Sequence, residues 1–243
     1  MDIWARRRKA GNWNKMADKF QKYIDEFYSG LKPLNLKEEG IFAEKTALIS
    51  VDMVKGFCSV GPLASPLVAA IIPNIVSLFE KVHTFGIQNF LLFQDTHHPE
   101  TPEFGSFPPH CLKGGVESET IDELKSLSFS DKFTIFEKNS LSPAFNTRFD
   151  AWISKNRYVE NFIIVGNCTD LCIYSHAMHL RLAANAFNLN RRVIVPENCT
   201  VTYDLPVEAA LKIGAMPHEA EMLHKLFLYH LSLNGVEIIS YFS

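Results

Sequence analysis

From Thr46 to the C-terminus, short apolar runs alternate with longer segments whose apolar residues recur at helical spacing. This alternation predicts a parallel sheet with helices on both faces, because parallel strands must be joined by crossover connections. We expect six strands, with the sequences TALISV, NFLLFQ, FTIFE, NFIIV, RRVIVP and VEIIS. Since no linker separates two cores, we predict one three-layer α/β/α domain with a six-stranded parallel sheet over residues 46–243.

Apolar periodicity also predicts the helices between these strands. They are expected at about residues 67–84, 118–128, 149–153, from the fourth strand to about 188, 206–214 and 217–232. A further amphipathic helix is expected over residues 13–29, where one stripe carries Trp13, Met16, Phe20, Ile24 and Phe27. We expect this helix to pack on the main domain or on a second subunit of a homo-oligomer.

The N-terminal extension, residues 1–45, also contains a basic cluster at Arg6–Lys9. We interpret it as a solvated arm; a targeting signal is the alternative, against which Asp2 argues. Across all 243 residues the net charge is −3, which gives no basic field for nucleic acid. Five cysteines without regular spacing do not form a secreted disulfide framework, so a cytoplasmic protein is expected. No apolar run looks long enough to span a bilayer, so no membrane partner is expected.

The stretch around the fourth strand has the form of a nucleophile site. Four apolar residues are followed by Gly166, by turn-forming residues and by Cys172 in the first turn of a helical segment. A helix N-terminus offers free N–H groups and a positive partial charge, and both favour a reactive thiolate. The alternative is a buried structural cysteine, which the neighbouring strand ends make less attractive.

Polar groups follow the other strands at the same edge of the predicted sheet. Asp52, Asp95 and Lys138 each end a strand, and ligands bind beyond the carboxyl ends of parallel strands. Asp52 is the candidate base for the Cys172 thiol, if burial or a cationic neighbour tunes its pKa. Lys138 can stabilise the thiolate and orient the carboxylate. None of the nine histidines is needed as the base.

The loop after the second strand holds candidate metal ligands. Asp95 and His97 have D-x-H spacing, and His110 returns after the loop with Glu100 or Glu103 between them. Two imidazoles with carboxylates suit Zn²⁺, Fe²⁺ or Mn²⁺ with open positions for water or substrate. The alternative is a polar loop whose histidines bond to backbone. His98 is the poorer ligand because adjacent side chains diverge. The other histidines are assigned to helix surfaces or packing, among them His176, His179, His218 and His224.

Several motifs in the same order resemble those of the isochorismatase-like cysteine hydrolases, and within them the nicotinamidases. They are LISVDMVKGFC, QDTH, FPPHCLKGG, FEKNSL and GNCTDLC, while PENCTVTYDLP and PHEAEMLH are most similar to plant-type members. The resemblance implies an isochorismatase-like, Rossmann-like sheet and hydrolysis of nicotinamide to nicotinate and ammonia in NAD salvage. It implies a catalytic triad of Asp52, Lys138 and Cys172. It also implies a cis peptide between Asn167 and Cys168, with the N–H groups of Cys168 and Cys172 as the oxyanion hole.

The resemblance further implies one divalent metal ion, with Zn²⁺ as the first choice and Fe²⁺ or Mn²⁺ as alternatives. Its ligands would be Asp95, His97 and His110, with Glu103 in a fourth position that varies between His and Glu in the family.

Phe57 and Phe107 match aromatic positions that flank the substrate ring. Leu171 stands where some relatives have His or Tyr, which leaves the breadth of substrates open.

Other functions remain as alternatives. An amidase of the same superfamily that acts on a carbamoyl or ureido compound would keep Asp52, Lys138 and Cys172 without needing the metal set. A nucleotide-binding module is disfavoured because no G-x-G-x-x-G follows the first strand. A redox protein is disfavoured because Cys168 and Cys172 do not form a C-x-x-C. A scaffold without catalysis would not explain both clusters.

Overall fold

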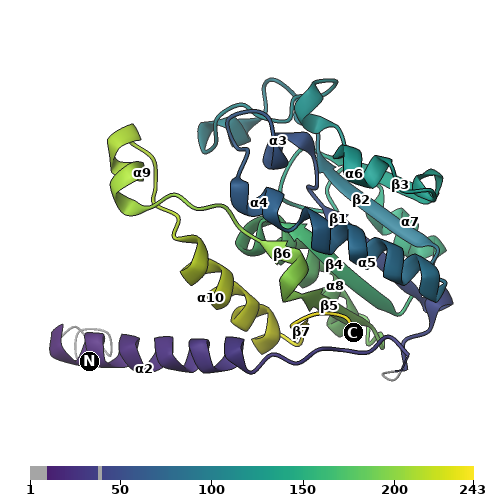
Figure 1. Ribbon diagram of the computed structural model, residues 1–243, viewed down its shortest axis with the longest axis horizontal. Helices are drawn as coiled ribbons and strands as arrows, with labels where there is room; N and C mark the ends of the chain where they lie inside the picture. The colour runs from purple at the N-terminus through teal and green to yellow at the C-terminus, as the bar shows by residue number, and fades with distance from the viewer. Residues whose placement is uncertain (1–9, 38–39) are drawn as a thin grey trace. The chain divides into compact units, whose positions relative to one another are not determined.

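The computed structural model describes residues 10–37 and 40–243, and the side chains from residue 15 onward. Arg6–Lys9 therefore lies outside the described residues. The chain divides into two compact units. The first unit ends at Leu31, and the second begins at Lys32. Helix α2 (Ala10–Ser29) forms the first unit, so the helix expected over residues 13–29 is present (Figure 1). Its packing partner stays a prediction.

Among the described residues, seven strands form one parallel sheet in the second unit. The order is β3-β2-β1-β4-β5-β7, and β6 pairs with β4 (Figure 1). The strands are β1 (Thr46–Val51), β2 (Asn89–Asp95), β3 (Phe133–Lys138), β4 (Asn161–Asn167), β5 (Arg192–Pro196), β6 (Thr200–Val201) and β7 (Glu237–Ile239). The six expected strands are thus confirmed. The additional strand, β6, has two residues, too few to produce a periodic pattern.

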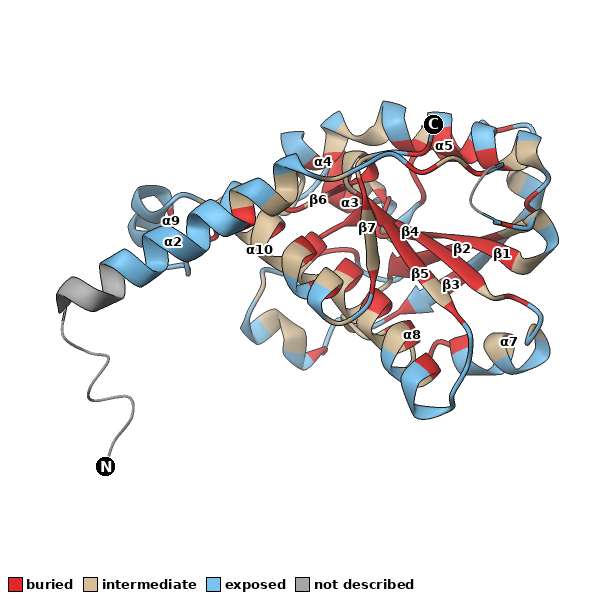
Figure 2. Ribbon diagram, turned by 90° about the horizontal axis from the view of Figure 1, so that it is seen from below, coloured by how far each residue is buried: buried red, intermediate tan, exposed pale blue. Residues whose placement is uncertain are grey.

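Helices cover both faces of the sheet, which confirms the three-layer prediction (Figure 2). On one face, α5 (Ile72–Phe85) packs against the core through Ile75, Leu78, Phe79 and Val82. On the other face, Phe93 of β2 contacts the rings of Phe149 in α7 (Phe149–Lys155) and His176 in α8 (Tyr174–Ala186), with centroids 4.8 and 4.6 Å away. The remaining α-helices are α3 (Lys55–Cys58), α4 (Pro66–Ala70), α6 (Asp122–Lys125), α9 (Val207–Ile213) and α10 (Ala220–Leu233).

Short helical turns join these elements. The 3₁₀ turns are η1 (Ala43–Lys45), η2 (Pro102–Gly105), η3 (Val116–Ser118), η4 (Ser130–Lys132) and η6 (Glu197–Cys199), and η5 (Thr169–Ile173) is a π-helical turn. The helix expected over residues 118–128 is reduced to η3 and the four residues of α6.

The helix expected over residues 67–84 is divided into α4 and α5 at Ile71. Pro73 causes the division, because proline has no N–H to donate and its ring blocks the preceding turn. By length and composition alone, the stretch Pro66–Phe85 is long and apolar enough to span a membrane. The prediction that no apolar run is long enough to span a bilayer is therefore wrong. The apolar side chains of α5 instead bury against the sheet.

Gly166, near the end of β4, lies too close to β1 for any other residue. Its φ is +116°, and a Cβ atom there would lie 2.1 Å from the carbonyl oxygen of Val51. Both conditions exclude an L side chain without movement of one strand. The central pair of strands, β1 and β4, can therefore approach closely just before η5, the turn that carries Cys172.

We predict that Gly166→Ala lowers the free energy of unfolding by more than about 2 kcal/mol, because the strands must separate or the backbone must strain. Denaturant unfolding measures this change. Gly105→Ala is the control, since its Cβ would meet nothing within 4 Å, and it should stay within about 0.5 kcal/mol of wild type. Equal stability of the two variants would contradict the close approach.

Candidate active site

The ends of β1, β2 and β3 meet at one edge of the sheet, as the strand pattern predicts. Asp95 and Lys138 are direct register partners on β2 and β3. Asp52 follows β1 with φ +54°, a left-handed conformation that aspartate tolerates better than most residues. Its Oδ1 accepts a hydrogen bond of 2.8 Å from the N–H of Asp95. The backbone itself therefore positions the first carboxylate beside the second.

The ammonium group of Lys138 joins the catalytic candidates. Its Nζ lies 2.8 Å from Oδ2 of Asp52 and 3.5 Å from Sγ of Cys172, and it also contacts the carboxylate of Asp95. All four side chains are buried. Burial disfavours the ammonium form, but the attraction of Asp52 and Asp95 outweighs it and holds the pKa of Lys138 well above its ordinary value. Lys138 is therefore a permanent cation in this site.

The two buried carboxylates are driven to different proton affinities. Burial raises the pKa of Asp52 to about 6, the negative charge of Asp95 adds to the effect, and Lys138 opposes it. Burial also acts on Asp95, but the charge of Lys138 and the neighbouring imidazoles of His110 and His97 outweigh it and hold the pKa of Asp95 below its usual range. A carboxylate with a raised pKa suits an acid–base role, while one that stays ionised suits cation binding.

Cys172 lies in η5, the π-helical turn between β4 and α8. The peptide bond between Asn167 and Cys168 is cis, the geometry that the family resemblance implies. The side-chain amide of Asn167 donates a 2.8 Å hydrogen bond to the carbonyl of Asp52, which ties this turn to the end of β1. The nucleophile and its candidate base are thus linked through backbone as well as through Lys138.

We expect a helix N-terminus to favour the thiolate of Cys172, but burial acts in the opposite direction here. Burial raises the pKa of the Cys172 thiol well above its ordinary value; Lys138 lowers it, but Asp52 and Asp95 raise it further. The thiol therefore keeps its proton at neutral pH. A base must remove that proton at the moment of attack, and this is the role for which the position of Asp52 is suited.

Asp95, His97 and His110 form a buried group whose ligand atoms all lie within 4.8 Å of one another. Oδ2 of Asp95 is 3.5 Å from Nε2 of His97 and 3.7 Å from Nε2 of His110. The other nitrogen of each ring takes part in a hydrogen bond outside the group. Nδ1 of His97 is 3.3 Å from Oδ1 of Asn139, and Nδ1 of His110 is 2.8 Å from the carbonyl oxygen of Pro108. Nε2 of His97 is buried without a hydrogen-bond partner, as a ligand atom would be. The group therefore fits a divalent metal ion.

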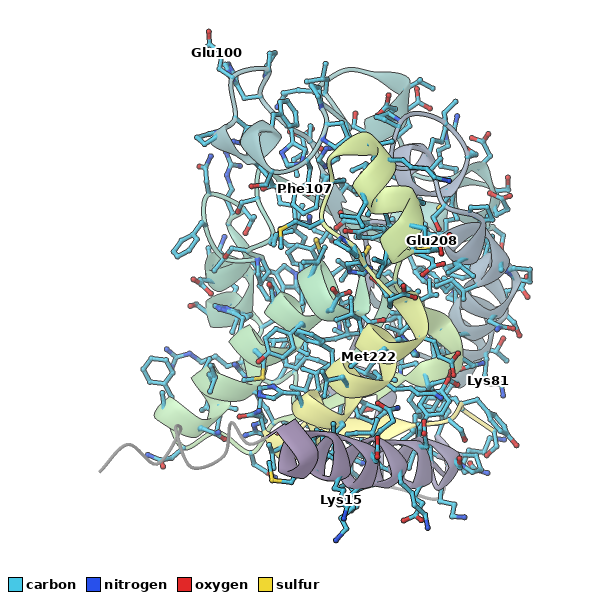
Figure 3. The ribbon with its side chains drawn as sticks, turned by 90° about the vertical axis from the view of Figure 1, so that its left-hand side faces the viewer. Lys15, Lys81, Glu100, Phe107, Glu208 and Met222 are labelled. Atoms are coloured by element: carbon cyan, nitrogen blue, oxygen red, sulfur yellow. The ribbon has the colours of Figure 1, made fainter. Side chains whose placement is uncertain are left out.

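Glu103 lies at the edge of this group. Its Oε1 is 3.9 Å from Nε2 of His97, and its side chain is half-buried. Glu100, the alternative ligand, is exposed at the outer end of the loop (Figure 3), and His98 is also exposed. The structure thus favours Glu103 over Glu100 by position.

Aromatic rings surround the two histidines of the metal loop. The ring centroid of Phe57 lies 5.6 Å from that of His110, and the ring centroid of Phe107, which is labelled in Figure 3, lies 6.4 Å from it. Phe104, which the sequence reasoning missed, contacts both His97 and His110, with centroids 5.5 and 5.6 Å away. Its position next to Glu103 was the available signal.

Among the described histidines, the assignment to helix surfaces or packing holds only in part. His176 is fully buried against Phe93. His179 pairs with Asp150 near the surface. His218 instead precedes α10 and bonds to Asp170, two residues before the candidate nucleophile. Asn139 was also missed, although it directly follows Lys138 in the FEKNSL motif.

We predict that His97→Ala lowers the affinity for Zn²⁺ more than about tenfold, because it removes a buried ligand atom. Metal content after dialysis and competition with a coloured chelator measure this. His98→Ala is the matched control and should keep wild-type affinity, since its side chain is exposed. Full metal content in His97→Ala would show that the ligand set is wrong.

Known proteins similar to this chain identify the family to which it belongs. The isochorismatase domain family matches residues 46–223. Nicotinamidase 1 of Arabidopsis thaliana is 31% identical over 208 residues, which cover 79% of this chain and 84% of that protein. A pyrazinamidase of Pyrococcus horikoshii in complex with zinc has a similar fold, with a TM-score of 0.60, 20% identity, and 80% and 98% of the two chains covered. N-carbamoylsarcosine amidase from Thermoplasma acidophilum is similar at a TM-score of 0.58, 24% identity, and 80% and 95% coverage. The chain therefore belongs to the isochorismatase family of hydrolases, with a nicotinamidase among its relatives.

Proposed function

We propose that this protein is a metal-containing cysteine amidohydrolase that converts nicotinamide to nicotinate and ammonia. The observation that carries the proposal is the position of Lys138 Nζ, which contacts Asp52, Asp95 and Cys172 together. One cation thereby joins the nucleophile, its base and the metal loop in a single buried cluster. The similarity to a nicotinamidase over most of the chain supports this choice of substrate.

The substrate ring binds between Phe57 and Phe107, beside the ring of His110. Aromatic walls with a single polar anchor suit a small flat ligand such as a pyridine carboxamide. Asp95, His97 and His110, with Glu103 as a fourth candidate, would hold the metal ion. A divalent ion held there would supply a Lewis acid for the pyridine nitrogen, which would orient the carboxamide toward Cys172.

The first half of the reaction forms a thioester. Asp52 accepts the proton of the Cys172 thiol as the sulfur attacks the carboxamide carbon. Lys138 stays protonated and offsets the negative charge that moves between the thiol and the carboxylate. The backbone N–H groups of Cys168 and Cys172 stabilise the oxyanion. Asp52 then returns the proton to the leaving nitrogen, which departs as ammonia.

The second half releases the acid. Asp52 accepts a proton from a water molecule, whose oxygen attacks the thioester carbon. The carbon–sulfur bond breaks, Cys172 recovers a proton from Asp52, and the product leaves as nicotinic acid, which ionises to nicotinate in solution. The same carboxylate therefore acts as base and then as acid in each half, which its raised pKa allows.

A carbamoyl or ureido compound is the alternative substrate, because the fold is shared with an N-carbamoylsarcosine amidase. Such a reaction would use Asp52, Lys138 and Cys172 in the same way. It would not need Asp95, His97 and His110 to hold a metal ion. Dependence of nicotinamide hydrolysis on metal therefore separates the two functions.

We predict that Cys172→Ala lowers ammonia release from nicotinamide at least about 10³-fold while metal content stays unchanged, because it removes the nucleophile alone. Cys199→Ala is the control: this cysteine is also buried, but it lies outside the candidate site, so activity should stay near that of wild type. A chelator that removes the metal should also abolish release. Activity that survives complete metal removal would discard the metal's role in holding substrate, and an inactive metal-loaded wild type would favour the carbamoyl or ureido substrates.

A further inference from the structure

The segment that joins β6 to α10 is closed at its base by a short pairing. Leu205 and His218 exchange two backbone hydrogen bonds, each of 2.8 Å. Between them the chain forms α9, which carries Glu208 in Figure 3, and then returns to α10, which carries Met222. His218 therefore stands where this segment rejoins the domain, which is why α10 begins at Ala220 rather than at residue 217.

Both ring nitrogens of His218 face hydrogen-bond acceptors. Nε2 lies 2.8 Å from Oδ2 of Asp170, and Nδ1 lies 2.8 Å from the backbone carbonyl of Tyr203. A neutral imidazole has only one N–H, so both bonds can form with the ionised carboxylate only if the ring carries two protons. The other carboxylate oxygen of Asp170 accepts a 2.6 Å bond from the hydroxyl of Thr202. The geometry is that of an imidazolium–carboxylate pair, with side chains only 10% and 6% exposed.

The groups around His218 agree with this charge state. Burial alone would lower the pKa of His218, but the bond and the charge of Asp170 outweigh it and raise it above its ordinary value. The ring of Tyr203 stacks on the ring of His218, with their centroids 3.8 Å apart. Burial raises the pKa of Tyr203 to about 12, and that of nearby Cys168 to about 12, so both are neutral. Asp170 is thus the charged partner of His218 among the described residues.

Asp170 belongs to η5, the turn that carries Cys172. The neighbouring residue, Thr169, forms a hydrogen bond with α10: its hydroxyl lies 2.8 Å from Nδ1 of His224. Two successive residues of the nucleophile turn are therefore held by histidines that lie about 50 residues later in the chain. We propose that His218, as an imidazolium paired with Asp170, is a positioning residue that holds the nucleophile turn in its reactive geometry.

This role rests on the proposed function, because the positioned groups are Cys172 and its N–H. Loss of the pair leaves the nucleophile, its base and the metal ligands intact but frees the turn that places the thiol against the substrate carbon. Misplacement of reacting groups by about 1 Å can cost on the order of 100-fold in rate. The loss should appear in kcat more than in KM, because none of the groups assigned to substrate binding is changed.

The test compares His218→Ala and the isosteric Asp170→Asn with His179→Ala in the metal-loaded, full-length protein. His179 is a matched control, since its Nε2 is 3.1 Å from Oδ1 of Asp150 in a more exposed pair that includes no residue of η5. We expect kcat for ammonia release to fall roughly 10- to 100-fold in the first two variants and to stay near wild type in the control. If His218→Ala fails to fold, Asp170→Asn decides. A kcat within twofold of wild type in Asp170→Asn would overturn the proposal.

A second measurement reads the charge on His218 directly. In an NMR titration, the His218 ring signal, assigned by its absence in His218→Ala, should have a midpoint above about 6.5, the ordinary value for histidine. Asp170→Asn should lower that midpoint. In wild type the imidazolium is present below its raised pKa and is lost as pH rises through it, so any alkaline decline of kcat caused by His218 should move to lower pH in Asp170→Asn. An unshifted or lowered midpoint in wild type would contradict the imidazolium.

Failure of the proposed function can be distinguished from failure of the positioning role of His218 and Asp170. If metal-loaded wild type releases no ammonia from nicotinamide, the substrate assignment fails, but hydrogen exchange still tests the turn. Amides of residues 169–173 should exchange about tenfold faster in His218→Ala and Asp170→Asn than in wild type, and unchanged in His179→Ala. Equal exchange in all four proteins would overturn the positioning role whatever the substrate is.

Discussion

The buried ammonium of Lys138 is the interaction on which the rest of the site depends. It lies among two carboxylates and a thiol, none of which is open to water. Without this cation, Asp52 and Asp95 would face each other as uncompensated buried charges, which is among the most costly arrangements in a protein interior. With it, Asp95 stays ionised, while burial and the charge of Asp95 still raise the pKa of Asp52 against the opposing effect of Lys138. The chemistry of the site therefore follows from the placement of a single amine.

The parallel sheet delivers these groups without long loops. Asp95 and Lys138 are register partners, and the side chain of Asp52 bonds to the backbone of Asp95. The candidate nucleophile, Cys172, lies in the turn after the neighbouring strand β4, which can approach β1 because residue 166 is glycine. Asp95 and Lys138 are thus carried by strands and Asp52 directly follows one, so the ladder of hydrogen bonds and core packing set their positions.

The sequence predicts much of this arrangement, because strand ends leave strong local signals. Polar residues directly after apolar runs identified Asp52, Asp95 and Lys138, and parallel topology brings such ends to one edge. Contacts between segments distant in the chain left no such signal. The bond between His218 and Asp170 joins residues 48 positions apart, and the burial that keeps Cys172 protonated depends on the completed core. Strand β6 was missed because two residues show no periodicity.

The most direct measurement of the central claim is mass spectrometry of protein quenched in acid during nicotinamide turnover. The account predicts a nicotinoyl adduct on Cys172 in the metal-loaded wild type and none in Lys138→Met, which keeps a long unbranched side chain but not the charge. An adduct at another residue, or an undiminished adduct on Cys172 in Lys138→Met, would contradict the claim that the buried ammonium enables the thiol to attack.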